Sequence, residues 1–282
     1  MKGLPTHAIV LLATVVGVVA GTTSAFSTEL GEGVSVRGAW RQGAMLLGYA
    51  PAGTRVEFAG HALELTPAGT FVIGLDRDAP SPAVLRLAVP GHAPRAWSHP
   101  VAPGNWKIQR IDGLKQAQVT PPPDVETRIH REAEAIRAVR QKQTPLSGFA
   151  EHFMWPVQGR VSSVFGSQRI LNGEPRQPHY GVDIAIPTGT PVKAPAAGVV
   201  SFVAPDLYFT GMTLMIDHGH GVQSVFAHLS RIDVKLGQPV AQGQVIALSG
   251  ASGRATGPNL HWGVSWFDER IDAAALAGPM PR

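Results

Sequence analysis

The sequence predicts a mainly β protein with an antiparallel β domain at its C-terminus, preceded by a small β-sandwich-like domain and a connecting helix. Short segments in which apolar and polar residues alternate recur along the chain, and many of the 32 Gly and 24 Pro residues lie between them. Only one stretch after the N-terminal region has apolar residues at helical spacing. The length of 282 residues and the hydrophobic fraction of 44% allow two folded domains.

The N-terminal domain is predicted for residues 26–115. In Thr54–Phe58, apolar and charged residues alternate, as expected for a strand with one buried face. Residues 26–48 carry little signal. Further short strands are predicted at 62–65, 70–75 and 84–89, with turn residues between them, which is typical of a small sandwich. The histidines of this region have no partner pattern and are interpreted as surface residues: His61, His92 and His99.

A linker with one helix is predicted for residues 116–150. Pro121–Pro123 is a stiff break, after which Asp124 can cap a helix that runs to about Gln143. We interpret the helix as a connection packed against one domain, because its apolar stripe is too short to favour a dimer-forming helix. The residues of that stripe are Val125, Ile129, Ala133, Ile136 and Val139.

The C-terminal domain is predicted for residues 151–282. Apolar segments of strand length alternate with Gly-rich turns, and no helical stretch of any length is expected. This pattern favours a compact antiparallel β domain. The predicted strands are 161–165, 191–203, 213–217, 223–227, 244–248 and 260–266.

Charge and composition restrict the partners and the cofactors. The net charge of +4 and the pI of about 9.7 are compatible with an anionic polymer, but no basic stripe indicates a nucleic-acid partner. The chain has no Cys, which excludes disulfides and thiolate metal sites. A metal ion would therefore be bound by His, Asp or Glu.

Residues 1–25 are typical of an export signal. Lys2 is followed by an uncharged apolar run from Ala8 to Gly21, and Thr23–Ala25 supplies small residues for cleavage after Ala25. An uncleaved anchor is the alternative, although the run is short for a membrane span. We expect a periplasmic or secreted protein without a stable membrane anchor after cleavage.

One segment, His179–Asp183, combines two metal-ligand residue types. In an extended strand, residues four apart lie about 13 Å from each other, too far for both to bind one ion. The backbone must therefore bend if both side chains bind the same metal, and Gly181 is where it can bend. His261 lies in a further segment that is predicted as a strand, and Asn259 lies on the same face of that strand. A His/Asp/His set would leave a fourth zinc position open for water, as catalytic sites do.

Another pair of histidines competes for this interpretation. His218-Gly219-His220 is the only His-x-His sequence in the chain. Its surroundings, from Asp217 to Gly221, have the composition of a hairpin turn between two strands. We therefore expect these two histidines not to bind the metal.

Residues from about 155 to 268 resemble the M23 family of metallopeptidases, the lysostaphin/LytM group. The segments that carry the resemblance are Arg160–Gly166, His179–Asp183, Gly189–Val192 with Ala196–Val200, Phe226–Ser230, Val240–Ile246 and Ser249–Trp262. The resemblance implies a zinc endopeptidase that cleaves peptides of bacterial peptidoglycan. It also implies that Zn²⁺ is bound by His179, Asp183 and His261, and that His228 assists catalysis.

This chain departs from the family pattern at Asn259, where the resemblance implies a second catalytic histidine. Asn cannot take a proton, but it can donate a hydrogen bond to an oxyanion. Two alternatives to the enzyme therefore stay open: a LytM-type regulator of another cell-wall hydrolase, and an adaptor in which residues 26–110 are the functional part. The loops at 166–178, 204–211 and 249–258 are expected to wall the substrate cleft.

Overall fold

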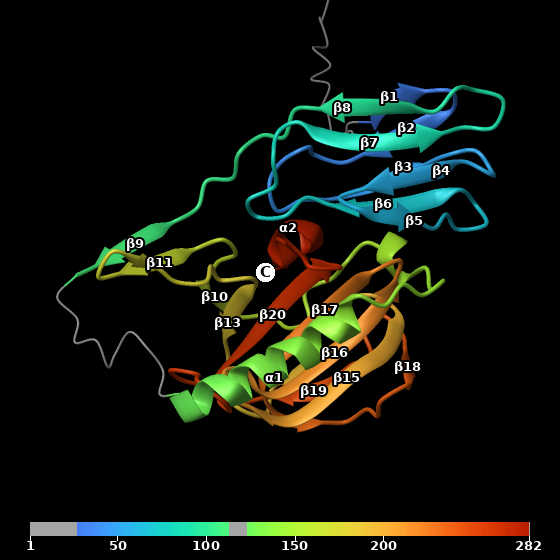
Figure 1. Ribbon diagram of the computed structural model, residues 1–282. Helices are drawn as coiled ribbons and strands as arrows, with labels where there is room; N and C mark the ends of the chain where they lie inside the picture. The colour runs from blue at the N-terminus through green and yellow to red at the C-terminus, as the bar shows by residue number, and fades with distance from the viewer. Residues whose placement is uncertain (1–26, 113–122, 282) are drawn as a thin grey trace, which may run out of the picture.

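The computed structural model describes residues 27–112 and 123–281. The predicted export signal, residues 1–25, lies outside these ranges, as does part of the predicted linker. In the described part of the chain, no helix combines the length and apolar character that a membrane span requires. The fold is mostly β, as predicted, and Figure 1 shows two β layers above a larger β domain.

The N-terminal part is a sandwich of two four-stranded antiparallel sheets. One has the strand order β1-β2-β3-β6 and the other β5-β4-β7-β8. The strands of the first sheet are β1 (Ser27–Gly31), β2 (Val34–Arg37), β3 (Met45–Tyr49) and β6 (Thr70–Gly74). Those of the second are β4 (Arg55–Phe58), β5 (His61–Leu63), β7 (Ala83–Ala88) and β8 (Arg95–His99).

Alternation along the strands builds the core of the sandwich. In β4 and β7, every second side chain is buried while those between are exposed. Strand β2 buries Val34 and Val36 completely, although it has only four residues. The sequence analysis did not predict the strands in the region 26–48, because the sequences of β1 and β3 show no alternation of apolar and polar residues.

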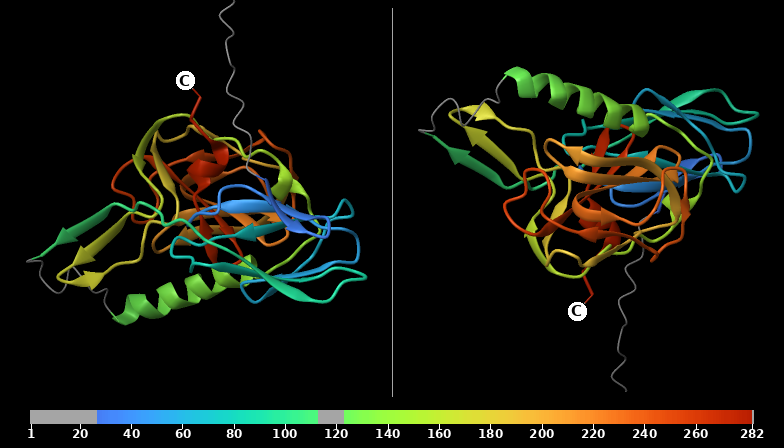
Figure 2. Two further views of the ribbon diagram at one scale, coloured as in Figure 1. Left: turned by 90° about the horizontal axis from the view of Figure 1, so that it is seen from above. Right: turned by 90° about the horizontal axis from the view of Figure 1, so that it is seen from below.

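The predicted helix is α1 (Pro123–Arg140), and it lies across the C-terminal domain (Figures 1 and 2). Arg128 donates to the Asp206 carboxylate at 3.0 Å, and the Glu132 carboxylate accepts from the backbone N–H of Tyr208 at 2.8 Å. The predicted packing of the helix against one domain is thus confirmed. The helix ends three residues before the predicted Gln143.

The C-terminal part is a ten-stranded antiparallel sheet, which confirms the predicted β domain. Its main path is β10-β13-β20-β17-β16-β15-β18, with β14, β19 and β21 paired beside it. Its strands are β10 (Arg160–Ser163), β13 (Val182–Ala185), β14 (Pro191–Lys193), β15 (Gly198–Leu207), β16 (Gly211–Gly219), β17 (Val222–Ile232), β18 (Pro239–Val240), β19 (Val245–Ser249), β20 (Asn259–Trp266) and β21 (Glu269–Ile271).

Two features of this part differ from the expectation. A short helix occurs in residues 151–282, namely α2 (Ala273–Ala277), whose N-cap is Asp272, and a 3-10 helix, η2 (Gly148–Ala150), lies in the predicted linker. In addition, β9 (Ile108–Ile111), which leaves the sandwich, pairs in parallel with β11 (Gln168–Leu171). With β12 (Glu174–Pro175), these strands form a separate small sheet.

The sandwich packs on the C-terminal domain through aromatic rings. His61 stacks on Phe267 with ring centroids 3.9 Å apart, and Phe58 lies 5.8 Å from Trp266. The interpretation of His61 as an ordinary surface residue is therefore wrong, because it lies in the contact between the two parts. His92 is exposed, whereas His99 is half-buried and stacks on a tryptophan.

Glu269 lies near this contact and should make stability depend on pH. Burial, together with the charges of Asp76 and Asp268, raises the pKa of Glu269 to about 7. Its neutral form is favoured on folding, so this contribution is fully present below about pH 4.5 and is lost as pH rises through about 7. We expect Glu269→Gln to raise the free energy of unfolding by about 1–3 kcal/mol at pH 8 and to change it little at pH 4.

Urea unfolding at both pH values measures this difference. Glu57→Gln is the matched control, since Glu57 is an exposed carboxylate on β4. Equal effects of Glu269→Gln at pH 4 and pH 8 would contradict the prediction.

Candidate metal centre

Three side chains that could bind a metal converge at the pairing of β13 with β20. Asp183 lies opposite His261 in the register of these strands. His179 Nε2 lies 3.0 Å from Asp183 Oδ1 and 3.0 Å from His261 Nδ1, and the remaining distance, His261 Nδ1 to Asp183 Oδ1, is 2.9 Å. The structure therefore brings together the three residues that the sequence analysis assigned to the metal.

The chain bends at Gly181, as predicted, so that His179 turns back toward Asp183. Glycine is also needed at this position because neighbouring atoms leave no room for a side chain. A Cβ at position 181 would lie 2.6 Å from the imidazole Cε1 of His261 and 2.6 Å from the carbonyl oxygen of Trp262. Any larger residue would push against the side chain of His261 directly.

The hydrogen bonds of His179 set the proton on its ring. Nδ1 lies 3.1 Å from the carbonyl oxygen of Val164, which can only accept, so Nδ1 carries the hydrogen of the neutral ring. Nε2 then presents a lone pair toward Asp183 and His261. In that tautomer, Nε2 could bind a metal ion together with Asp183 and His261.

The charges of the three groups are strongly coupled to one another. Burial alone would raise the pKa of Asp183, but its contacts with His179 and His261 hold that pKa well below its usual range. Burial alone would lower the pKa of His179, but the hydrogen bond and the charge of Asp183 raise it. Burial lowers the pKa of His261. The hydrogen bond and the charge of Asp183 offset only part of this effect. A carboxylate and imidazole nitrogens thus converge on one point.

The donor set fits a tetrahedral zinc ion. Ligand atoms about 2.0–2.1 Å from the metal lie about 3.3 Å from one another in a tetrahedral site, close to the separations found here. The side chains are 17–27% exposed, so the point at which they converge is open on one side. An open position is a property of catalytic zinc sites rather than of structural ones. In residues 27–112 and 123–281, these residues form the one His/Asp/Glu group of three or more suited to a metal.

His228 lies next to this group. The pairing of β17 with β20 reaches Ala227, opposite His261, and His228 follows with a φ of +62°. This left-handed conformation is rare for a residue with a side chain and is common at functional sites. The ring of His228 lies 6.3 Å from that of His261, between centroids. Its Nδ1 contacts the carbonyl oxygen of Ser252 at 2.8 Å, which leaves Nε2 free to accept a proton.

Asn259 begins β20, two residues before His261 and on the same strand face. Its Nδ2 donates to the carbonyl oxygen of Gly257 at 2.8 Å. Its Oδ1 is buried and has no hydrogen-bond partner among the described residues. The side chain thus has an unused acceptor and one remaining N–H, so its role as a donor to an oxyanion stays a prediction.

The competing pair, His218 and His220, lies elsewhere, at the turn between β16 and β17. His218 is fully buried and contacts Ser224 Oγ at 2.8 Å, and burial lowers its pKa to about 4. His220 has a φ of +51° and contacts the carbonyl oxygen of Glu64 in the sandwich. Both histidines therefore have structural contacts and neither belongs to the metal group.

A cleft of about 920 Å³ opens beside His179 and Asp183. All three loops expected to wall it contribute, for example through Phe209 and Arg254. The segments 107–109 and 161–164 also line the cleft, and the sequence analysis missed both of them. Segment 107–109 lies outside the family resemblance, so no motif could have indicated it. The cleft has four basic side chains, Lys107, Arg169, Arg176 and Arg254, and its one acidic residue is Asp183.

Known proteins resemble this chain over the same region. The model of Peptidase family M23 matches residues 177–273. A metalloprotease of Haemophilus influenzae is 45% identical over 125 residues, which are 44% of this chain and 26% of that protein. The peptidoglycan DD-endopeptidase ShyA of Vibrio cholerae is 44% identical over 129 residues, which are 45% of this chain and 30% of that protein. The chain thus spans less than a third of the length of these curated relatives.

One solved structure resembles nearly the whole chain. It is a crystal structure of a candidate M23 peptidase from Pseudomonas aeruginosa, with 33% sequence identity and a TM-score of 0.66. The likeness covers 85% of this chain and 95% of that one, so it includes the sandwich as well as the C-terminal domain. Together with the family match over the residues that surround the metal centre, this places the chain in peptidase family M23.

Proposed function

We propose that this protein is a zinc-dependent endopeptidase that cleaves peptide bonds in the stem peptides or cross-links of peptidoglycan. The observation that carries the proposal is the convergence of His179, Asp183 and His261, with the ring of His228 beside them. The complete set of three ligands and a free imidazole nitrogen are what a metal-assisted hydrolysis needs.

Different residues of this chain bind the metal and transfer protons in the proposed reaction. His179, Asp183 and His261 would hold Zn²⁺, which polarises a carbonyl group and acidifies water. His228 is oriented by the bond from its Nδ1 to Ser252, so its Nε2 can take a proton from the attacking water. The same nitrogen can then deliver the proton to the leaving amine. Asn259 has no group that can take a proton, so His228 acts as the sole general acid and base.

The substrate class follows from the cleft and from the relatives. Lys107, Arg169 and Arg254, together with Arg176, which is paired with Glu174 at 2.8 Å, favour a peptide that carries carboxylates, as peptidoglycan stem peptides do. The relative from Vibrio cholerae is named a peptidoglycan DD-endopeptidase. A peptidoglycan substrate also implies action in the periplasm or outside the cell.

A second candidate function rests on Asn259. Loss of one catalytic histidine is compatible with a regulator that docks on another cell-wall hydrolase and no longer turns over substrate itself. However, all three metal-ligand positions carry residues that can bind a metal, and the bond between His228 Nδ1 and Ser252 orients the His228 ring. These two observations favour the enzyme.

Turnover of purified peptidoglycan by the zinc-loaded protein tests the proposal. Release of soluble peptides or loss of cross-linked fragments, abolished by a chelator and restored by added Zn²⁺, is the expected result. A protein that binds one zinc ion but releases nothing from peptidoglycan would overturn the enzyme and favour the regulator.

A further inference from the structure

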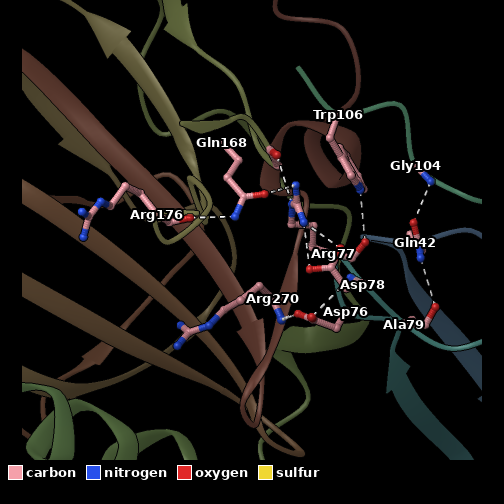
Figure 3. A network of polar contacts seen from close by, with 11 residues as sticks. Gln42, Asp76, Arg77, Asp78, Ala79, Gly104, Trp106, Gln168, Arg176 and Arg270 are labelled. Carbon is pink, nitrogen blue, oxygen red and sulfur yellow. Dashed lines mark hydrogen bonds and ion pairs between the residues drawn. The ribbon is translucent and has the colours of Figure 1, made fainter. Parts of the chain in front are cut away.

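A buried arginine of the N-terminal sandwich contacts a segment, residues 164–168, that lies next to the metal ligand His179. Arg77 lies in the connection between β6 and β7 and is 5% exposed. Its Nε donates to the carbonyl oxygen of Gly166 at 3.0 Å, and its Nη2 donates to Gln168 Oε1 at 3.2 Å. Asp78 balances its charge at 2.6 Å (Figure 3). One guanidinium group thus joins the two parts of the protein.

The segment that Arg77 holds is the same one that holds His179. Gly166 N–H donates to the carbonyl oxygen of His179, and His179 N–H donates to that of Ser167, each at 2.8 Å. The imidazole Nδ1 of His179 contacts the carbonyl oxygen of Val164 at 3.1 Å. Residues 164–167 therefore hold both the backbone and the imidazole ring of His179.

A tryptophan from the sandwich side closes the same contact. Trp106 Nε1 donates to the carbonyl oxygen of Arg77 at 3.2 Å, as Figure 3 shows. Its ring lies on Gly166, where an added Cβ would be 2.2 Å from the indole, and meets Phe165 edge-on at 5.4 Å. Just beyond it along the chain, the carbonyl oxygen of Lys107 accepts from the backbone N–H of Gln168 at 2.9 Å.

Within the C-terminal domain, residues 164–168 are held by their bonds to His179 and by the bond from Gln168 Nε2 to the carbonyl oxygen of Arg176 at 2.7 Å. They follow β10, which is the edge strand of the large sheet, and three of the four residues of β10 are exposed. The outer side of β10 has no further strand of that sheet. Contacts from the sandwich side therefore supply much of the packing that keeps this segment in place.

We propose that Arg77 is a positioning residue for the metal ligand His179, so that the N-terminal sandwich is a working part of the metal centre rather than a separate adaptor. The inference rests on the proposed metal-binding role of His179. Arg77 acts through Gly166 and the segment 164–167 and does not itself touch the metal or the substrate. Groups that orient a ligand in this indirect way commonly affect metal affinity about 10–100-fold.

The test uses the full-length protein and compares two arginine-to-lysine variants. Arg77→Lys keeps the positive charge but loses the fork that reaches Gly166 and Gln168 together. Arg95→Lys is the matched control, because Arg95 also binds a carbonyl oxygen and a carboxylate, those of Leu30 and Glu32, but entirely within the sandwich. Zinc affinity is measured by competition with a chromophoric chelator, and Co²⁺ substitution adds the absorption spectrum of the metal centre.

We expect Arg77→Lys to weaken zinc binding about 10–100-fold and to alter the Co²⁺ spectrum. Arg95→Lys should keep the affinity of the wild type even if its melting temperature falls equally. Trp106→Phe is the second variant: it removes the N–H that donates to Arg77 and part of the ring that lies on Gly166, but it leaves the guanidinium of Arg77 in place. It should weaken zinc binding in the same direction by less.

Three outcomes separate the proposals. Wild-type affinity and an unchanged Co²⁺ spectrum in Arg77→Lys overturn the positioning role while leaving the metal centre intact. If Arg77→Lys does not fold, wild-type affinity in Trp106→Phe overturns the positioning role in the same way. A wild-type protein that binds no zinc at all overturns the proposed function, and the positioning role with it.

Discussion

Replacement of Asp183 by alanine is expected to remove most of the bound zinc and to reduce peptidoglycan turnover to the level of the metal-free protein. Asp183 is the only anionic member of the group, and its Oδ1 contacts both histidine nitrogens at 2.9–3.0 Å. Without it, two neutral imidazoles would remain, which bind zinc weakly. Metal analysis of the purified variant, together with the turnover assay, measures both effects.

His220→Ala is the control for this experiment. His220 also lies in a histidine-containing segment, but its contact is the carbonyl oxygen of Glu64. We expect it to retain the zinc content of the wild type. Loss of zinc from His220→Ala, with zinc retained in Asp183→Ala, would mean that the metal is bound at the turn between β16 and β17.

Replacement of His228 by alanine should leave the zinc in place and lower turnover by about 10²-fold or more, the usual contribution of a general acid–base group. His228 is not within the group of three ligands, so its removal takes away a proton acceptor without opening the metal site. The kinetic effect should appear in kcat/KM, with zinc content measured on the same preparation. Equal losses of zinc and of activity would instead indicate that His228 supports the metal.

Asn259 variants show whether the neighbouring position takes part. Asn259→Ala should cost less than His228→Ala, unless the amide stabilises the oxyanion, in which case about 10²–10³-fold is expected. Asn259→His restores the family pattern and should keep or raise activity. If the wild type and both alanine variants show no turnover while binding zinc, the enzyme proposal fails although the fold stands.

The sequence alone predicted the β fold and the residues that meet at the centre. Segments between turn residues indicate strands where apolar and polar residues alternate, as in Arg55–Phe58. The His179–Asp183 spacing demanded a bend, and Gly181 was the residue that allowed it. The bend is a local feature, so it can be derived from neighbouring residues. The assignment of His261, 78 positions after Asp183, came instead from the family resemblance.

Only the tertiary structure revealed what lies around the centre. The contact of Arg77 with Gly166 joins residues 89 positions apart, and β9 reaches the cleft by pairing with a strand 60 residues further along the chain. The orientation of His228 by Ser252 depends on a loop 24 residues away. Hydrogen bonds and packing between distant segments leave no periodic pattern in either segment, because each partner is chosen by shape and by the satisfaction of polar groups after the chain has folded.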